Sequence, residues 1–461
     1  MLDTFHEFIK IVNSYVWGPP MLVLLFGTHL YFTFRLKFIQ IHTFRGIKLS
    51  FTKDPEADGD VSQWDSLSTA LAATIGTGNI VGVATGIALG GPGALLWLWL
   101  TGVFGIATKY AEAVLSVKYR QKTSDGTMLG GPMYALEKGL GMKWLAVTFC
   151  IFTAIAAFGI GNMVQANALS GVVNATFGIP PYVTGIFITV LVAFTILGGV
   201  KSIAKVCGLL VPFMAVFYSL GCLIICVINA QYLIPSIVLM TQAAFTPHAA
   251  GGGFIGASVM MAARFGVARG LFSNESGLGS APIVAAAAQT RNSVRQGLVS
   301  MTGTFWDTVV GCALTGLALL TTIMRSPEGF EGLQGAAMTS KAFDQFPVLG
   351  PIILTVGMLT FAFATILGWS YYGERAAEYL LGKKAIKPYR VMWVIACMLG
   401  SVASLSLVWD LSDSMNALMA LPNLVALFLL RKVIIKDTED YLWSDNLDMT
   451  APVEKEHSFK A

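Results

Sequence analysis

Two short stretches of this sequence place glycine beside polar residues in the middle of long apolar runs. They are residues 76–79 (GTGN) and residues 270–279 (GLFSNESGLG). Glycine costs a helix about 1 kcal/mol relative to alanine, so both stretches can unwind at low cost. An unwound helix inside a membrane offers free backbone N–H and C=O groups that bind a charged substrate and a coupling ion. The two stretches therefore predict a ligand site made largely of main chain.

The rest of the chain is too apolar for a water-soluble protein. Of its 461 residues 55% are hydrophobic and only 12% are charged, whereas a soluble domain carries about 25% charged residues. The mean hydropathy is +0.68. This composition excludes a soluble enzyme, a nucleic-acid-binding protein, a disordered chain and a secreted disulfide scaffold, and it predicts an all-α polytopic membrane protein.

All six cysteines fall inside apolar runs, which indicates small buried hydrophobic residues rather than disulfides or metal ligands. They are Cys150, Cys207, Cys222, Cys226, Cys312 and Cys397.

Eleven apolar segments are long enough to be transmembrane helices, since about 20 residues cross the hydrocarbon core. We predict spans at 15–35, 64–90, 93–118, 144–177, 182–199, 205–229, 252–290, 297–324, 350–381, 389–410 and 412–432. Two of them, 144–177 and 252–290, exceed one crossing and must tilt, break or extend beyond the membrane.

The positions of Lys and Arg predict the orientation, because cytoplasmic loops retain basic residues. Most of the 30 basic residues lie in the segments that would share one side, whereas the opposite side holds Lys10, Arg325 and Lys341. We therefore expect a multi-pass plasma-membrane protein with its N-terminus outside and its C-terminus in the cytoplasm.

The two glycine-containing stretches lie five spans apart, so the segments that carry them cross the membrane in opposite senses. We expect an extra helix and linker (1–63), a first five-helix repeat (64–230), a second, inverted repeat (252–432) and a cytoplasmic tail (433–461). Inverted repeats with discontinuous helices are typical of secondary transporters. The alternative is close helix packing through small residues such as Gly78, Gly82 and Gly86, which explains glycine but not Asn79, Asn274 or Glu275.

Other functional classes lack their motifs. GTGNIVG spaces its glycines as G-x-G-x-x-x-G with no preceding strand, so it is not a dinucleotide-binding turn, and no Walker lysine follows it. No Ser/His/Asp set or HExxH motif indicates an enzyme. Transport must then be driven by an ion gradient, or it is passive.

Several long motifs resemble the alanine or glycine:cation symporter family over about residues 15–430. They are ATIGTGNIVGVATGIALGGPGALLWLWLTGVFGIATKYAEAVLSVKYR, GGPMYALEKGLG, FGIGNMVQAN, GLFSNESGLGSAPIVAAAA and LGWSYYGERAAEYL. The resemblance implies a LeuT-like 5+5 inverted repeat of ten core helices, preceded here by one extra helix. It also implies sodium-coupled uptake of alanine or glycine by alternating access.

A zwitterionic amino acid needs partners for both its carboxylate and its ammonium group in a place of low dielectric constant. We expect the main chain of residues 76–79 and 271–277 to supply most of them. The side chains that could add bonds are Thr77, Asn79, Ser273 and Asn274, beside the backbone of Gly78, and on other spans Gln165 and Trp369.

Each of the more distant candidates has an ordinary structural alternative. Gln165, Asn162 and Asn167 could clamp helices together, and Trp369 could be core or lipid-interface packing instead of a pocket wall. With these alternatives open, we expect Gln165 to bind both charged groups of the substrate through its amide, and Trp369 to exclude side chains larger than a methyl group.

Sodium requires oxygen ligands. Matching GTGN to other sodium symporters of the implied fold suggests the carbonyls of Ala72 and Ile75 with Thr365 as one Na⁺ site. Thr74 and Asn79, completed by Asp307, could form a second site beside the substrate. An acid such as Asp307 is costly in lipid and should face the interior, where a purely structural role is the alternative.

Glu275 is the other acid of the predicted site, and Arg264 or Arg269 is its candidate partner. Proton coupling through Asp307 or Glu275, and an amino-acid-binding channel or sensor, are alternative functions. We expect Na⁺ as the coupling ion with no cofactor, membrane lipid around a monomer, and no nucleic-acid partner.

Overall fold

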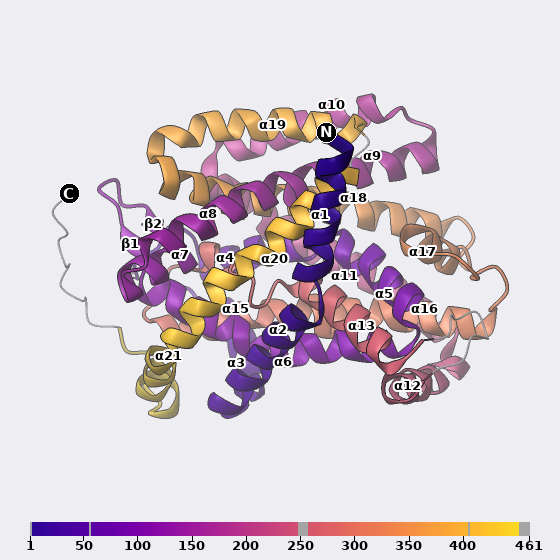
Figure 1. Ribbon diagram of the computed structural model, residues 1–461, viewed down its shortest axis with the longest axis horizontal. Helices are drawn as coiled ribbons and strands as arrows, with labels where there is room; N and C mark the ends of the chain where they lie inside the picture. The colour runs from indigo at the N-terminus through magenta and orange to yellow at the C-terminus, as the bar shows by residue number, and fades with distance from the viewer. Residues whose placement is uncertain (1, 55–56, 248–256, 404–405, 451–461) are drawn as a thin grey trace.

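The computed structural model describes residues 2–54, 57–247, 257–403 and 406–450, and it is built almost entirely of helices (Figure 1). Two short strands, β1 (Gln121–Lys122) and β2 (Met128–Leu129), form an antiparallel pair. All six cysteines are buried and free, as the sequence predicted.

In the described part of the chain, seven helical segments are long and apolar enough to cross a membrane. They comprise α1 (Leu2–Val16) with α2 (Pro19–Arg35), α6 (Gly93–Lys118), α8 (Lys143–Phe158) with α9 (Val164–Phe177), α11 (Gly199–Ile228), α15 (Ser293–Thr304) with α16 (Ala313–Arg325), α18 (Leu349–Leu381) and α19 (Ile386–Val402).

Two further spans are bent pairs of helices. The first joins α4 (Gln63–Thr74) to α5 (Val83–Gly90) with a bend of 52°, and the second joins α20 (Ser406–Leu429) to α21 (Arg431–Thr438) with a bend of 58°. With these pairs the count of candidate spans rises to nine, and α10 (Pro181–Leu197) and α12 (Ala230–Phe245) are shorter apolar helices. The chain is therefore a helical multi-pass membrane protein, while the number eleven and the repeat boundaries stay predictions.

The longest predicted span, 252–290, is not one helix. The structure has α13 (Val259–Asn274) and a short α14 (Pro282–Ala285), with irregular chain between them. Residues 252–256 lie outside the described part. The predicted spans also leave out residues 230–251, where the structure has α12. The remaining short helices are α3 (Thr43–Ser50), α7 (Pro132–Tyr134) and α17 (Gly335–Phe343).

Two long helices hold the irregular segments in place. Helix α6 packs against α13, α14 and α15, and α18 packs against α4, α8 and α11. Near the top of Figure 1, α10 and α19 lie side by side, and α19 also contacts α9. Both broken segments therefore lie against continuous helices, which can supply fixed side chains to the unwound backbone.

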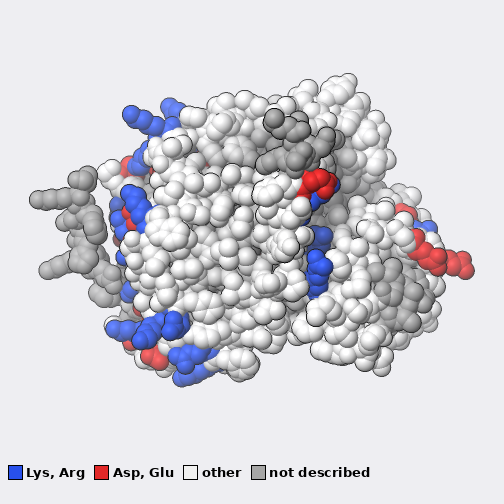
Figure 2. Space-filling view, viewed as in Figure 1, with Lys and Arg blue, Asp and Glu red and all other residues white. Residues whose placement is uncertain are grey.

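Charged residues are unevenly distributed over the surface. Figure 2 shows Lys and Arg gathered at the left edge, the end of the molecule that carries β1, β2 and α21 in Figure 1, whereas most of the face between the two ends is uncharged. This distribution agrees with the predicted cytoplasmic side, although the direction of insertion stays a prediction.

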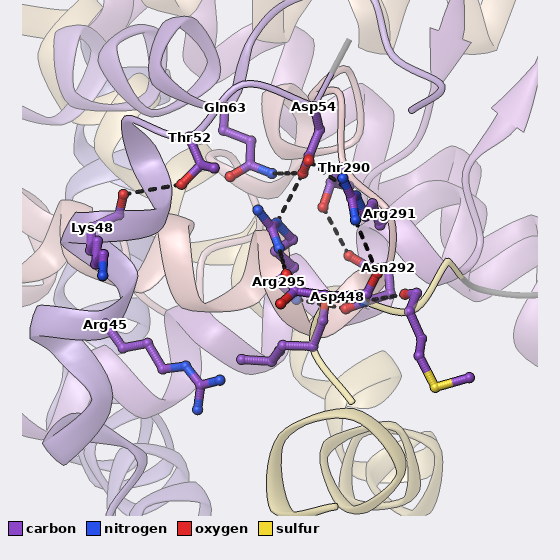
Figure 3. A network of polar contacts seen from close by, with 12 residues as sticks. Arg45, Lys48, Thr52, Asp54, Gln63, Thr290, Arg291, Asn292, Arg295 and Asp448 are labelled. Carbon is purple, nitrogen blue, oxygen red and sulfur yellow. Dashed lines mark hydrogen bonds and ion pairs between the residues drawn. The ribbon is translucent and has the colours of Figure 1, made fainter. Parts of the chain in front are cut away.

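A network of ion pairs connects the linker before α4 to the N-terminal end of α15 and to the C-terminal segment (Figure 3). The Asp54 carboxylate lies 3.0 Å from Arg291 Nε and 2.9 Å from Arg295 Nε, and Gln63 donates to it. Arg295 also pairs with Asp448 at 2.5 Å. Asp54 and Arg295 are both buried.

Candidate functional site

The first broken span unwinds directly after Thr74. Helix α4 ends there, Ile75 adopts an extended backbone, and a π-helical turn over Gly78–Gly82 leads into α5. Asn79 stabilises the break because its Oδ1 accepts a hydrogen bond from the Gly76 N–H at 3.0 Å. The chain is non-helical at Ile75 and Gly76 and helical again from Thr77, so the break lies at the N-terminal edge of the predicted stretch 76–79.

The second broken span unwinds after Asn274. Glu275 has the left-handed backbone that ends α13, with φ of 55°, and Gly277 and Gly279 have φ of 89° and 88°. The two larger angles are readily adopted only by glycine, which explains why glycine stands at 277 and 279. The Asn274 side chain caps the turn by accepting from the Ser276 N–H at 2.9 Å.

The two breaks meet at Asp307, on the helical segment between α15 and α16. One carboxylate oxygen accepts from Asn79 Nδ2 at 2.7 Å. The other accepts from Ser273 Oγ at 2.9 Å and from Thr308 Oγ1 at 2.6 Å. The side chain is fully buried. The sequence placed Asp307 near Asn79 as an option, and the structure joins them and adds Ser273.

The breaks also touch directly. A Cβ placed on Gly78 would lie 3.4 Å from the ring of Phe272 and 3.7 Å from the Cα of Ser273. Residues about 200 positions apart in the sequence thus form one buried centre, which we call the break centre: residues 75–79, 272–277 and Asp307.

Glu112 of α6 holds the second break, and the sequence analysis missed it. Its Oε1 accepts from the N–H groups of Gly277 and Gly279 at 3.1 and 3.0 Å, and from Asn423 Nδ2 at 2.7 Å. Asn423 also donates to the carbonyl of Gly277. The signal was available, because an acid inside an apolar span such as α6 is rare and usually functional.

The partner predicted for Glu275 is wrong. Its Oε1 accepts from Trp369 Nε1 at 3.1 Å, and its Oε2 accepts from Ser280 Oγ. Neither Arg264 nor Arg269 pairs with it. Charge alone suggested an arginine, but two neutral donors satisfy this carboxylate, and the arginines line a different cavity.

Gln165 and Thr365 approach the first break from α9 and α18. A Cβ on Gly76 would lie 2.6 Å from Thr365 Oγ1 and 3.8 Å from Gln165 Oε1, so only glycine fits there. Gln165 Nε2 donates to the Ile160 carbonyl, while its buried Oε1 has no hydrogen-bond partner among the described residues. Gln165 therefore presents a free acceptor beside the unwound chain.

The neighbouring amides act as clamps between helices. Asn162 donates to the carbonyl of Trp393, and Asn167 donates to those of Gly400 and Ala403. Trp369 is buried, and its side chain lies within contact distance of a Cβ placed on Gly161.

Some of the oxygen atoms proposed as Na⁺ ligands lie close to one another, and others are bonded elsewhere. Thr365 Oγ1 is 3.5 Å from the Ile75 carbonyl oxygen and 3.0 Å from that of Phe361. Ala72 is buried one turn earlier on α4. Thr74 Oγ1, by contrast, donates to the carbonyls of Ala70 and Leu71. Thr77 is buried at the start of the π-helical turn.

A small cavity beside the second break is lined by a buried ammonium group that the sequence analysis also missed. Lys109 of α6 is 3% exposed, and its Nζ has no hydrogen-bond partner in the described structure. Asn274 Nδ2 is likewise buried without a partner, and both residues line this cavity of about 10 Å³ with Thr74. That volume holds about one water molecule.

Comparison with known proteins gives three informative matches. A model of the sodium:alanine symporter family matches residues 2–456. The sodium/alanine symporter AgcS of Methanococcus maripaludis is 51% identical over 444 residues, covering 95% of this chain and 97% of the relative. An uncharacterized transporter of Haemophilus influenzae is 52% identical over 443 residues, covering 95% and 96%.

Among solved structures, the crystal structure of MhsT in complex with L-phenylalanine matches with a TM-score of 0.57 at 16% identity. The match covers 86% of this chain and 94% of that chain. This likeness supports the LeuT-like fold expected from the sequence, and at such low identity it concerns the fold alone.

Proposed function

Because the chain belongs to the sodium:alanine symporter family, we propose that it takes up alanine and glycine with Na⁺ through the break centre. The protein is a secondary active transporter of amino acids and not an enzyme. Its choice of substrate, its ion sites and its orientation, with the N-terminus outside, are the parts of this proposal that experiments must test.

The observation that carries the proposal is the joining of both broken spans by one buried acid. Asp307 accepts hydrogen bonds from Asn79 on the first break and Ser273 on the second. Among the described residues, no Lys or Arg pairs with it. A buried carboxylate with neutral donors alone keeps its negative charge available to a mobile cation.

The substrate's two charged groups have different partners in this proposal. The ammonium group is bound by unwound carbonyls near Gly76 and by Gln165 Oε1, which is free to accept. The carboxylate is bound by the backbone of residues 76–79 and 271–277 together with Na⁺. Of the side chains predicted to contact it, Thr77 and Asn274 retain donors for this role, whereas Asn79 and Ser273 are engaged with Asp307.

Trp369 stays our proposed size filter. It is fixed by its bond to Glu275 and by contact with Gly161, so a substrate with a longer side chain could not displace it cheaply. One Na⁺ site comprises the carbonyls of Ala72 and Ile75 with Thr365, and the other comprises Thr74, Asn79 and Asp307. Each ion moving inward through 100 mV releases about 2.3 kcal/mol.

The test is uptake of labelled alanine by the purified full-length protein in proteoliposomes. We expect accumulation when Na⁺ is imposed outside and none when K⁺ replaces it. A pH gradient without Na⁺ is the second arm, and accumulation in that arm alone would mean that protons are the coupling ion. Equilibration without accumulation would indicate a channel. Competition by glycine, L-alanine, D-alanine and serine then defines the substrate range.

A further inference from the structure

A basic segment with exposed aromatic rings follows the first span. Residues 35–53 contain five Lys and Arg and no Asp or Glu, and they run from the end of α2 through α3. In Figure 2 basic side chains gather at the lower left, where Figure 1 places α3 and α21. Such a segment directly beside a span concentrates positive charge at the membrane surface.

Helix α3 is fixed to α15 through the face that carries its small and polar residues. Its buried residues are Thr43, Gly46 and Ser50. A Cβ on Gly46 would clash with the carbonyl oxygen of Leu298, so the two helix backbones are in contact. Because Leu298 lies at the start of a predicted span, 297–324, we expect α3 to lie at the membrane boundary.

The outward face of α3 carries two large exposed aromatic rings, Phe44 and, just after its last residue, Phe51. They are 76% and 65% exposed. The ring centroid of Phe44 lies 6.3 Å from that of Phe305, edge to face, and the Phe51 ring stacks on that of Trp64 at 4.7 Å. Phe305 and Trp64 both belong to predicted spans, which places the two rings at the edge of the hydrocarbon, where aromatic side chains are favoured.

Two basic residues, Arg45 and Lys48, lie beside these rings, one helical turn apart. The Arg45 side chain is 42% exposed and lies 3.4 Å from the carboxylate of Asp445, which is 88% exposed, so this pair contributes little. Lys48 is exposed, and among the described residues it has no ion pair. In Figure 3 neither side chain takes part in the ion pairs of Asp54. Both cations are therefore available to an anion from outside the protein.

An anionic phospholipid matches both features of this face. Its phosphate binds Lys and Arg, and its acyl chains cover aromatic rings, as they do at amphipathic helices that lie in the interface. A soluble anion would bind the cations but leave Phe44 and Phe51 exposed to water. A zwitterionic lipid brings an ammonium group, which offsets the attraction of its phosphate.

We propose that the face of α3 formed by Phe44, Arg45, Lys48 and Phe51 binds an anionic phospholipid such as phosphatidylglycerol. The lipid phosphate lies between Arg45 and Lys48, and the acyl chains lie against the two phenylalanine rings. The site is separate from the break centre, and the proposal does not depend on which substrate or ion is transported.

The test detects lipid directly at α3 in the full-length protein. All six native cysteines are buried, so Thr52→Cys, at an exposed position just after α3, accepts a thiol-reactive fluorophore over a low background. In phosphatidylcholine liposomes, spin-labelled phosphatidylglycerol should quench this fluorophore at a lower mole fraction than spin-labelled phosphatidylcholine of the same chain length. Each basic residue near the surface favours an anionic lipid about fivefold, so we expect the two half-quenching mole fractions to differ at least about fivefold.

Arg45→Gln combined with Lys48→Gln should remove this difference between the two lipids. The matched control is Lys122→Gln combined with Lys383→Gln, which removes two charges from exposed ion pairs at the same end of the molecule and should leave the difference unchanged. Arg45→Lys combined with Lys48→Arg should also keep it, because both charges are retained. Phe44→Ala should weaken quenching by both lipids without changing their ratio.

Equal quenching by the two lipids without any further substitution would overturn the site. So would an equal loss of the difference in the control variant, because the attraction would then come from the total charge of that end. Displacement of spin-labelled phosphatidylglycerol by inorganic phosphate, beyond the effect of KCl at equal ionic strength, would mean a site for a soluble anion instead of a lipid. Melting temperatures show whether each variant is folded, so a loss of quenching through misfolding is recognised.

Discussion

Buried carboxylates are satisfied in two different ways in two regions of this protein. In the break centre and beside it, Asp307, Glu275 and Glu112 accept only from amides, hydroxyls, an indole and backbone N–H groups. In the network of Figure 3, Asp54 is paired with two arginines. All four acids are buried.

An acid that is paired with arginine stabilises the structure, whereas an acid bonded only to neutral donors can bind a cation reversibly. The guanidinium of Arg295, 2.9 Å away, neutralises the Asp54 carboxylate permanently, so Asp54 cannot bind a further cation. Neutral donors stabilise a carboxylate without cancelling its charge. Na⁺ can then complete the electrostatic balance at Asp307 when it binds and leave it when it dissociates.

The largest effect on transport is expected from Asp307→Asn. Removing the charge while keeping the side-chain size should lower Na⁺-dependent alanine uptake at least about 100-fold, equivalent to ~2.7 kcal/mol. Uptake in proteoliposomes and direct Na⁺ binding measure it. The matched control is Asp54→Asn, the same chemical change in the paired region, which should leave the Na⁺ concentration at half-maximal uptake unchanged.

If Asp307→Asn kept normal Na⁺ dependence while Asp54→Asn lost it, the distinction between the two regions would be wrong. Folding must be checked in both variants by gel filtration and thermal melting, since a misfolded protein also fails to transport.

The next largest effect on transport is expected from Glu112→Gln. The amide carbonyl can still accept, but the charge-assisted bonds to Gly277 and Gly279 weaken, so the second break becomes less ordered. Uptake should fall about 10-fold, or ~1.4 kcal/mol. Hydrogen exchange measured by mass spectrometry should be faster in residues 275–281.

Glu137→Gln is the control for Glu112. Glu137 accepts from Tyr379 away from the breaks, and its change should not alter exchange in residues 275–281. Unchanged exchange in Glu112→Gln would mean that other contacts define the second break.

Much of the fold and part of the site could be predicted from sequence. The GTGN and GLFSNESGLG stretches mark both breaks, because glycine and polar residues in mid-span have few other uses. The sequence also suggested the meeting of Asn79 and Asp307. It could not show that Ser273 joins them, because residues 273 and 307 come together only through packing of α13 against the segment that follows α15.

The wrong and missed residues have a common cause. Glu275 was matched to an arginine on charge alone, although its true partners are Trp369 and Ser280, whose polar atoms give no such signal in sequence. Glu112 and Lys109 lie outside the glycine-rich stretches, so the glycine pattern does not mark them. Both are charged residues in an apolar span, which, as for Asp307, is itself a sign of a functional residue.

A third prediction concerns stability in the paired region. Asp54→Asn leaves the buried Arg295 with only one of its two ionic partners, Asp448. Breaking a buried ion pair typically costs about 3 to 5 kcal/mol of folding stability. We expect a clear fall in melting temperature in detergent. Asp448→Asn is the comparison, because Asp448 is 86% exposed on its side chain and its loss should cost under about 1 kcal/mol. Equal losses in the two variants would contradict the role of burial.

The smallest effect is expected from Lys122→Ala, which tests an exposed pair outside the spans. Lys122 Nζ lies 2.7 Å from Asp58, with the side chains 55% and 60% exposed, so the pair should contribute less than about 1 kcal/mol. Lys122 lowers the pKa of Asp58 below its ordinary value through a hydrogen bond.

A lowered pKa of Asp58 stabilises the folded protein at neutral pH, and this stabilisation is lost as the pH falls through the folded-state pKa. The melting difference between wild type and Lys122→Ala should therefore be small at pH 7, shrink in 1 M salt and vanish in acid, with Na⁺-driven uptake unchanged. A loss of uptake would show that ion pairing outside the spans also controls transport, and the separation of structural acids from cation-serving acids would then fail.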